Sequence, residues 1–501
     1  MPCTSLLVGK HASYDGSTMI ARNDDAPSNH FTAKKMAIFE AQQKARVYRS
    51  VLSHVEIPLP AGALRCTAMP NVLPDEGIWA AAGVNEANVA MTATETITSN
   101  PRVLGADPLV EFCPATPEHP EIPGGIGEED IVCLVLPYIR SAREGVLRLG
   151  QLLAQYGTYE MNGIAFQDVN EIWWLETIGG HHWIARRVPD DAYVVMPNQF
   201  GLDFFDLEDA FDAQRSHLCS PDLKEFLKAN FLDLSSPDAA SSCPQLLDAR
   251  AAFGSHDDAD HVYNTPRAWY MLRYFNPHTK KWDGPDADYT PQSDDLPWCM
   301  VPERKITVED IKYVLSSHFQ GTCYDPYASS SDEKTRGIYR PIGINRNDFL
   351  GLFQLRPYVP ADSCALEWSA FASNVFNTLL PLYGNVDVLP SYLSCTEETV
   401  STDSFYWASR LIAAMADASY AKSLFHIERY QLGVQSKVRA LLNRFDAQLS
   451  AEPDEQKRAQ LRVSANEAIA DCVQKETNAV LAKVLFELSC QMKNAYARSD
   501  A

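Results

Sequence analysis

Cys3 lies almost at the start of the chain, and the charged residues Arg22 and Asp25 follow it within one short segment. A cysteine this close to the start can become the first residue of the mature protein. It would then supply both a thiol nucleophile and an α-amine. A cysteine thiol has a pKa of about 8.5, which a nearby cation lowers, and an α-amine titrates at about 7.7 to 8.0. Such an amine can take the thiol proton near neutral pH.

The elements that must position these groups are two short apolar runs, 6–8 and 19–21, on either side of a turn-rich stretch at 11–16. This pattern, with an Asp-Gly pair in the turn, predicts a β-hairpin. Pairing the runs about a turn centred near residues 13 and 14 places Cys3 opposite residues near Asp24. The sulfur, a guanidinium and a carboxylate would then meet at the open end of one hairpin.

In that arrangement Arg22 would favour the thiolate form of Cys3, and Asp25 would orient the α-ammonium. Spacing alone leaves a second interpretation open. Cys3 would then be a small apolar residue in a strand, and Arg22 an ordinary surface charge.

The segment from Cys3 to Asp25 resembles the start of the PepD-type dipeptidases, a family of N-terminal nucleophile (Ntn) hydrolases that includes the secernins. The resemblance spans most of the first 330 residues. Further blocks similar to this family lie at 83–96, 156–166, 172–185, 197–199, 263–269 and 315–321, with weaker similarity at 340–345.

The wider Ntn group includes the penicillin V acylases, and the resemblance implies site residues by position. Cys3 matches the nucleophile, and Arg22 and Asp25 match the charged pair that follows it. Asn198 matches the asparagine that binds the oxyanion, and Arg267 matches a later arginine.

The second oxyanion donor does not carry over. Its position falls on or beside Glu95, and an ionised carboxylate donates no hydrogen bond. Asn85 and backbone amides are the candidates that remain.

The first two residues, Met1 and Pro2, would block the α-amine of Cys3. Both must be removed for Ntn chemistry. Self-cleavage, by attack of the Cys3 thiol on the carbonyl before it, is the route that the family resemblance favours.

Apolar spacing along the chain favours an α+β fold, an αββα sandwich of antiparallel sheets, and the family resemblance implies that it is an Ntn-hydrolase sandwich. The runs 77–82 and 88–94 predict one strand pair, and Ser141 with Glu144 predicts the capped start of a helix. Thr307 predicts the start of another helix, which would run through His318. An antiparallel meander is predicted from the four β-rich runs 163–166, 171–176, 183–186 and 192–196.

The last hundred residues change character, which divides the chain into a catalytic domain at 1–400 and a helical extension at 401–501. The stretches 405–449 and 455–497 are almost free of Pro and Gly and are separated by Pro453. They predict an antiparallel helical hairpin. The hairpin would pack on the core or mediate self-association into a homo-oligomer, and core packing is the more usual outcome.

Composition predicts a cytoplasmic protein. The net charge of −22 argues against nucleic acid or an anionic membrane as a partner. The sequence contains neither an apolar run long enough to span a membrane nor a signal-peptide pattern. The twelve cysteines include no Cys-x-x-Cys pair and are interpreted as buried free thiols.

These features together predict a cysteine-type hydrolase of short peptides, a dipeptidase, that forms an acyl-enzyme and needs no metal or cofactor. Two alternatives stay open. One is a non-peptide amidase of the penicillin V acylase kind, and the other is a secernin-like protein that acts in trafficking or binding.

Overall fold

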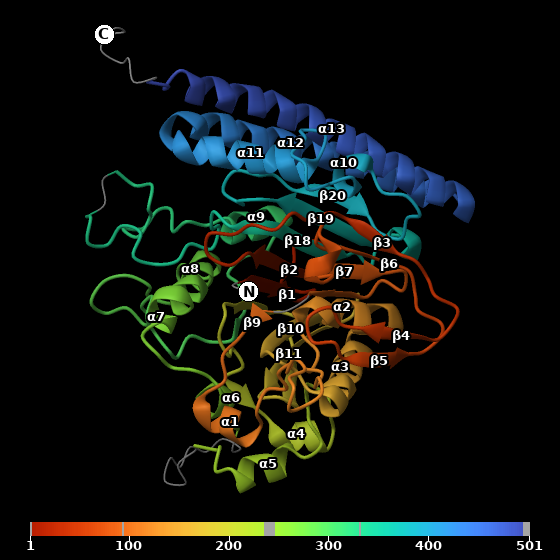
Figure 1. The fold of residues 1–501 in the computed structure, drawn as a ribbon. Coiled ribbons are helices and arrows are strands. Elements are labelled where there is room, and N and C mark those ends of the chain that lie inside the picture. The colour runs from red at the N-terminus through yellow and green to blue at the C-terminus, as the bar shows by residue number, and fades with distance from the viewer. Residues whose placement is uncertain (1–2, 93–94, 235–245, 330–331, 494–501) are drawn as a thin grey trace.

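The computed structural model of the protein describes residues 3–92, 95–234, 246–329 and 332–493, and its strands form two large sheets (Figure 1). The first sheet has seven strands, in the order β17 (Cys299–Met300), β13 (Tyr193–Met196), β1 (Thr4–Val8), β2 (Thr18–Asp25), β18 (Asn347–Leu355), β19 (Ala365–Phe371) and β20 (Leu380–Tyr383).

The second sheet has nine strands among the described residues. Its order is β15 (His217–Cys219), β12 (His182–Arg187), β11 (Ile172–Ile178), β10 (Asn162–Gln167), β8 (Ala90–Thr92), β7 (Ala82–Asn85), β6 (Cys66–Ala68) and β3 (Ala37–Phe39), with β9 (Glu95–Thr96) also paired to β10.

The two sheets pack face to face, with helices on their outer sides. β2 contacts β8 and β10 of the second sheet, and β18 contacts β7. Helix α3 (Ala142–Tyr156) packs on β10, β11 and β12, whereas α8 (Thr265–Phe275) packs on β13 and α9 (Val308–Leu315) on β2. All pairings between the strands of these sheets are antiparallel within the described residues, which confirms the predicted α+β class with antiparallel sheets.

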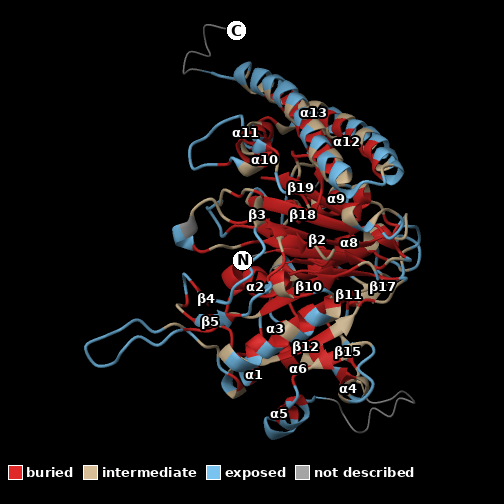
Figure 2. Ribbon diagram, turned by 90° about the vertical axis from the view of Figure 1, so that its right-hand side faces the viewer, coloured by how far each residue is buried: buried red, intermediate tan, exposed pale blue. Residues whose placement is uncertain are grey.

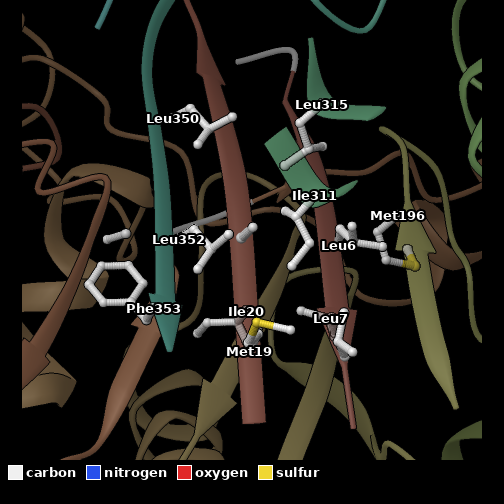
Figure 3. Packing of buried hydrophobic residues seen from close by; sticks show 14 of the residues in the cluster. Leu6, Leu7, Met19, Ile20, Met196, Ile311, Leu315, Leu350, Leu352 and Phe353 are labelled. Atoms are coloured by element: carbon white, nitrogen blue, oxygen red, sulfur yellow. The ribbon is translucent and has the colours of Figure 1, made fainter. Parts of the chain in front are cut away.

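The core is concentrated between these layers, as the band of buried strands in Figure 2 shows. All eight residues of β2 are buried, because helix α9 covers one face and the second sheet covers the other. Figure 3 shows Ile311 and Leu315 of α9 close to Leu6 of β1. Strands buried on both faces place any polar side chain that they carry in a water-poor environment.

The first hairpin has the predicted register. Ser5 pairs with Arg22 and Thr4 with Asn23, so the turn is centred between residues 13 and 14. In the turn, Asp15 accepts a hydrogen bond from the backbone N–H of Ser17 at 3.1 Å, and Gly16 has a φ of +82° that favours glycine.

The predicted pairing of the second strand pair is confirmed by β7 and β8, although β7 begins at Ala82 rather than at residue 77. Gly77 and Trp79 have positive φ values of +96° and +48°, which a regular strand does not allow.

Three of the four runs in the predicted meander are adjacent strands, but the fourth is not. β10, β11 and β12 pair in sequence, whereas β13 pairs with β1 and β17 in the other sheet. The prediction of one four-stranded meander is therefore wrong. Period-two patterning does not say which sheet a fully buried strand joins.

Both predicted helix starts are confirmed. The hydroxyl of Ser141 accepts from the N–H of Glu144 at the start of α3, and Thr307 forms a capping box with Asp310 at the start of α9. Helix α9 ends at Leu315, three residues before the predicted end.

The C-terminal part forms three helices rather than two, α11 (Phe405–Ala418), α12 (Tyr420–Ala451) and α13 (Glu455–Ser489). The predicted hairpin is the pair α12 and α13, and the first predicted stretch is broken at Ser419, whose backbone is not helical. α11 packs on β19 and α13 on β20, at the top of Figure 1. Within the described residues, none of the helices has an apolar stretch able to cross a membrane. The domain division at residue 400 stays a prediction.

Short elements complete the described fold. The helices are α1 (Pro101–Ala106), α2 (Glu128–Val135), α4 (Leu207–Phe211), α5 (Leu223–Ala229), α6 (Ala249–Phe253), α7 (Asp260–Tyr263) and α10 (Ser391–Ser394). Two small sheets pair β4 (Arg46–Arg49) with β5 (Glu56–Leu59) and β14 (Phe204–Phe205) with β16 (Leu247–Asp248).

The cysteines differ in part from the prediction. None of the eleven in the described part of the chain forms a disulfide, but only Cys3, Cys66, Cys133 and Cys364 are buried. The other seven are partly or fully exposed, because they lie on short edge elements, loops and the outer faces of helices. Cys243 lies outside the described residues.

Candidate active site

Cys3 directly precedes β1, and the neighbouring strands β2 and β13 fix the position of β1 from both sides. Its side chain is fully buried. Because Thr4 pairs with Asn23, the next position outward places Cys3 beside Asp24, as predicted from the hairpin. The Sγ of Cys3 lies 3.9 Å from Oδ1 of Asp24.

Arg22 connects the sulfur to two carboxylates. Its Nη2 donates to Sγ of Cys3 at 2.8 Å, to Oδ1 of Asp24 at 3.0 Å and to Oε1 of Glu128, while Nη1 donates to the carbonyl of Ala81 at 2.8 Å. Burial alone would lower the pKa of Arg22. The negative charges of Cys3, Glu128 and Asp24 outweigh burial and raise that pKa well above its usual value. The guanidinium is therefore held in its charged form against the thiol.

Asp24 is held by a second buried cation, Lys34. The Nζ of Lys34 lies 2.9 Å from Oδ2 of Asp24 and donates to the carbonyl of Trp79 at 3.0 Å. Burial raises the pKa of Asp24, but Lys34 and Arg22 more than offset this and lower it. Asp24 is an ionised carboxylate beside the thiol, a position that the sequence had not assigned to a site residue.

Asp25 points to the opposite side of β2, because successive residues of a strand face opposite ways. Its carboxylate accepts hydrogen bonds from Arg340 and Asn347. Burial raises the pKa of Asp25 despite the charge of Arg340. The carboxylates that Arg22 links to the sulfur are Asp24 and Glu128, and the predicted role of Asp25 toward the α-amine stays a prediction.

Asn198 lies two residues beyond the end of β13, the strand that pairs with β1. Its Oδ1 accepts from the backbone N of Cys3 at 3.1 Å, and its Nδ2 donates to the carbonyl of Thr96 at 2.9 Å. The pairing of β13 with β1 thus brings a residue from 195 positions away to the backbone of Cys3.

Arg267, on α8, fixes both of these groups. Its Nη1 donates to the carbonyl of Cys3 and to Oγ1 of Thr4 at 2.6 Å, and its Nη2 donates to Oδ1 of Asn198 at 2.7 Å and Oδ1 of Asn264 at 2.8 Å. The structure therefore brings together four of the five predicted site residues, Cys3, Arg22, Asn198 and Arg267. The fifth, Asp25, follows Asp24 in β2, and its side chain lies on the opposite face of that strand.

Asn85, a candidate second oxyanion donor, has a different position. Its Nδ2 donates to the carbonyls of Leu136 and Ile139, and its Oδ1 accepts from the N–H groups of Ala87 and Val89. Asn85 therefore holds the β7–β8 turn, and its Nδ2 donates to carbonyls away from Cys3. The side chain of Glu95 lies outside the described residues, so a backbone amide is the candidate that remains.

The start of α2 supplies residues that the sequence analysis missed. Glu128, Glu129 and Asp130 are all buried, and Glu128 forms an ion pair with Arg22. Gly127 is the N-cap, where a Cβ atom would collide with the ring of Tyr159. Acidic residues just before the apolar run 131–135 are typical of a first helical turn, and this signal was available in the sequence.

Three of these groups also have the spacing of metal ligands. The Sγ of Cys3 and carboxylate oxygens of Asp24 and Glu128 lie within 4.8 Å of one another. However, Nη2 of Arg22 donates to all three, so the guanidinium takes the central position that an ion would need. The arrangement is that of a cysteine sulfur and a guanidinium with two flanking carboxylates.

Comparison with known proteins shows which family the chain is similar to. Residues 2–433 match the model of peptidase family C69. A protein named "Dipeptidase" from Bifidobacterium longum is 51% identical over 100% of both chains.

Two further relatives have similar names. "Probable dipeptidase A" from Streptococcus pyogenes serotype M3 is 49% identical over 100% of both chains. "Probable dipeptidase B" from Lactococcus lactis is 43% identical over 99% of this chain and 98% of its own. These matches confirm the family resemblance that the sequence blocks indicated.

Proposed function

Because the chain belongs to peptidase family C69, we propose that it is a cysteine-type dipeptidase whose nucleophile is the Sγ of Cys3. The observation that carries the proposal is the hydrogen bond of 2.8 Å from Arg22 to this sulfur. A thiolate is the reactive form of cysteine, and a buried guanidinium favours it. The names of the relatives support a dipeptide as the substrate.

The first step of the proposed mechanism is loss of Met1 and Pro2. The thiol of Cys3 attacks the carbonyl carbon of Pro2, and the peptide C–N bond breaks as the thioester forms. Water then hydrolyses the thioester, which releases the thiol and leaves a free α-amine on Cys3. The contact between Asn198 Oδ1 and the nitrogen of Cys3 supports this atom as part of the site.

In the catalytic cycle, the α-amine of Cys3 takes the thiol proton and Sγ attacks the scissile carbonyl carbon. Negative charge develops on the carbonyl oxygen, where Asn198 and a backbone amide stabilise it. The C–N bond breaks, and the α-ammonium gives its proton to the leaving amine. Water then attacks the thioester carbon and the α-amine takes a proton from that water. The C–S bond breaks, the free acid leaves, and the proton returns from the α-ammonium to the sulfur of Cys3.

We also propose that the fold belongs to the Ntn class. Two facing antiparallel sheets with helices outside them, and a cysteine just before a central strand of one sheet, support this assignment.

Mass spectrometry of the purified protein tests the processing step. We expect the wild-type chain to begin at Cys3. A variant without Pro2, from which only the initiator methionine has to be removed, should also begin at Cys3. A fully active protein that still begins with Pro2 would show that the α-amine is not the base.

A panel of dipeptides assayed with the wild type and with Cys3→Ser tests the activity. We expect turnover by the wild type and loss of it in the variant. Failure of the correctly processed wild type to cleave any dipeptide would favour a binding role instead.

A further inference from the structure

Near the proposed nucleophile lie three acceptor side chains, those of Glu128 at the start of α2, Glu160 just before β10 and Asn162 at the start of β10. The carboxylate of Glu128 reaches Cys3 through Arg22, as described above. The carboxylate of Glu160 accepts from the backbone N–H of Glu128 at 2.5 Å. Asn162, two residues further along, donates from Nδ2 to the carbonyl of Glu160 at 3.4 Å.

Glu128 and Glu160 are two acidic side chains near one another. Arg22, the cation that pairs with Glu128, also serves Cys3 and Asp24. Glu160 is half-buried, and burial and the charge of Glu128 both raise its pKa. A cation that bound here would be stabilised by both carboxylates.

Asn162 provides an independent indication that a donor is missing. Its side chain is fully buried, and no hydrogen-bond donor of the described residues reaches its Oδ1. Because a buried acceptor without a partner is destabilising, such an atom commonly has a ligand or water partner. Asn162 pairs across the sheet with Thr96, whose carbonyl accepts from Asn198. The unsatisfied acceptor therefore belongs to the neighbourhood of Cys3.

The chemistry of a dipeptide fits these acceptors. Its α-ammonium nitrogen lies about 2.5 Å from the scissile carbonyl carbon, because a single Cα separates them. That carbon must come within about 3 to 3.5 Å of Sγ for attack. The ammonium must then lie close to the sulfur, and a carboxylate oxygen of Glu128 is within 4.8 Å of Sγ. An ammonium group has three donors to offer three acceptors.

We propose that Glu128, Glu160 and the Oδ1 of Asn162 bind the free α-ammonium group of the substrate. This inference rests on the proposed function. It explains why the substrate has one residue before the scissile bond, since a longer peptide would place an amide where the ammonium belongs. An N-acylated peptide would likewise bring no ammonium group to Glu160, whereas Glu128 keeps its ion pair with Arg22.

The test compares a dipeptide with its N-acetylated form. For the wild type we expect kcat/KM to be at least about 100-fold higher for the unblocked dipeptide. Glu160→Gln keeps the shape of the side chain but removes its charge. It should lower kcat/KM for the unblocked dipeptide by about 10- to 100-fold while changing kcat/KM for the acetylated form little.

Glu303→Gln is the matched control. Glu303 also accepts from backbone N–H groups, those of His278 and Thr279, but pairs with none of the site residues named here. Equal cleavage of both substrates by the wild type, or an unchanged preference in Glu160→Gln, would overturn the inference while leaving the dipeptidase proposal intact.

A binding measurement separates this inference from the catalytic proposal. Calorimetry would use Cys3→Ser protein with Pro2 deleted, so that removal of the initiator methionine exposes the α-amine of position 3 without self-cleavage. We expect the unblocked dipeptide to bind and the acetylated form to bind at least about tenfold more weakly. Equal binding of the two, or no binding of either, would refute ammonium recognition. A wild type that binds the unblocked dipeptide selectively but never cleaves it would refute the proposed function alone.

Discussion

The Nη2 of Arg22 lies 2.8 Å from the Sγ of Cys3, and both side chains are fully buried. Position 22 of β2 and position 3 before β1 are close because the hairpin is antiparallel and in register. A charge-assisted hydrogen bond in a water-poor site is stronger than the same contact in solvent.

Replacing Arg22 with Met should reduce the fraction of Cys3 that is ionised at a given pH, because the cation that favours the thiolate is lost. We expect kcat/KM to fall by about 10- to 100-fold or more and the alkylation rate of Cys3 to rise only at higher pH than in the wild type. Iodoacetamide labelling as a function of pH, read by mass spectrometry, measures this shift. Arg186→Met, which removes a partly exposed ion pair with Asp203, is the control. An unchanged labelling profile in Arg22→Met would remove Arg22 from thiolate stabilisation.

Replacing Asn198 with Ala should remove stabilisation of the developing oxyanion. We expect kcat/KM to fall by about 100- to 1,000-fold, while Cys3 is still alkylated because its contact with Arg22 remains. Steady-state kinetics with a dipeptide, alongside thiol labelling, measures both quantities. Gln199→Ala removes the neighbouring amide and serves as the control. If Asn198→Ala kept more than about a tenth of wild-type activity, another group would have to bind the oxyanion.

Glu367 should make stability depend on pH. It is buried on β19, and burial raises its pKa to about 7 even though Thr67 donates to it. A glutamate in the unfolded chain has a pKa of about 4.3, so the folded protein binds the proton more tightly. The stability that protonated Glu367 contributes is therefore fully present below about pH 4.3 and is lost as pH rises toward about 7. Glu367→Gln abolishes this loss.

Urea unfolding at pH 5, 6, 7 and 8 tests that prediction. Relative to the wild type, Glu367→Gln should gain about 3 kcal/mol in unfolding free energy between pH 5 and pH 8. Glu309→Gln, at a partly exposed ion pair with Arg439, should show no such trend. Identical pH slopes for Glu367→Gln and the wild type would mean that Glu367 stays ionised in the folded protein.

Asn466 of α13 should be important for attachment of the C-terminal helices. Its Oδ1 accepts from the N–H of Tyr383 at 2.8 Å, and its Nδ2 donates to the carbonyl of Tyr383 at 3.0 Å. Asn466→Ala leaves two buried backbone groups of β20 without partners, which should cost about 2 to 4 kcal/mol. Thermal unfolding, and limited proteolysis of the segment between β20 and α12, would report the change. The exposed Asn478→Ala on the same helix should have almost no effect. Similar stability of the two variants would show that the helices attach by other contacts.

Some of the site was predictable because it depends on neighbours in sequence. The two runs around an Asp-Gly turn fix the hairpin register, and the register brings Cys3 next to Asp24 and Arg22. Capping residues predicted the starts of α3 and α9 for the same reason, since a cap satisfies backbone groups within one turn of itself.

Other parts needed the tertiary structure. Strand alternation places Asp24 on the same face of β2 as Arg22 and Asp25 on the opposite face, but which element covers each face depends on distant parts of the chain. Glu128 and Asn162 reach the site only because α2 and β10 belong to the second sheet and its helices, which pack face to face with the first.

The sequence by itself determined the hairpin that brings Cys3 and Arg22 together, the family and the helical character of the C-terminal part. The tertiary structure decided that β13 leaves the meander to pair with β1, that Asn198 and Arg267 hold the backbone of Cys3, and that buried carboxylates surround Arg22. The physical reason is the range of the interactions. Turns, caps and periodicity act within a few residues, whereas the burial and pairing of charges depend on which distant elements exclude water from them.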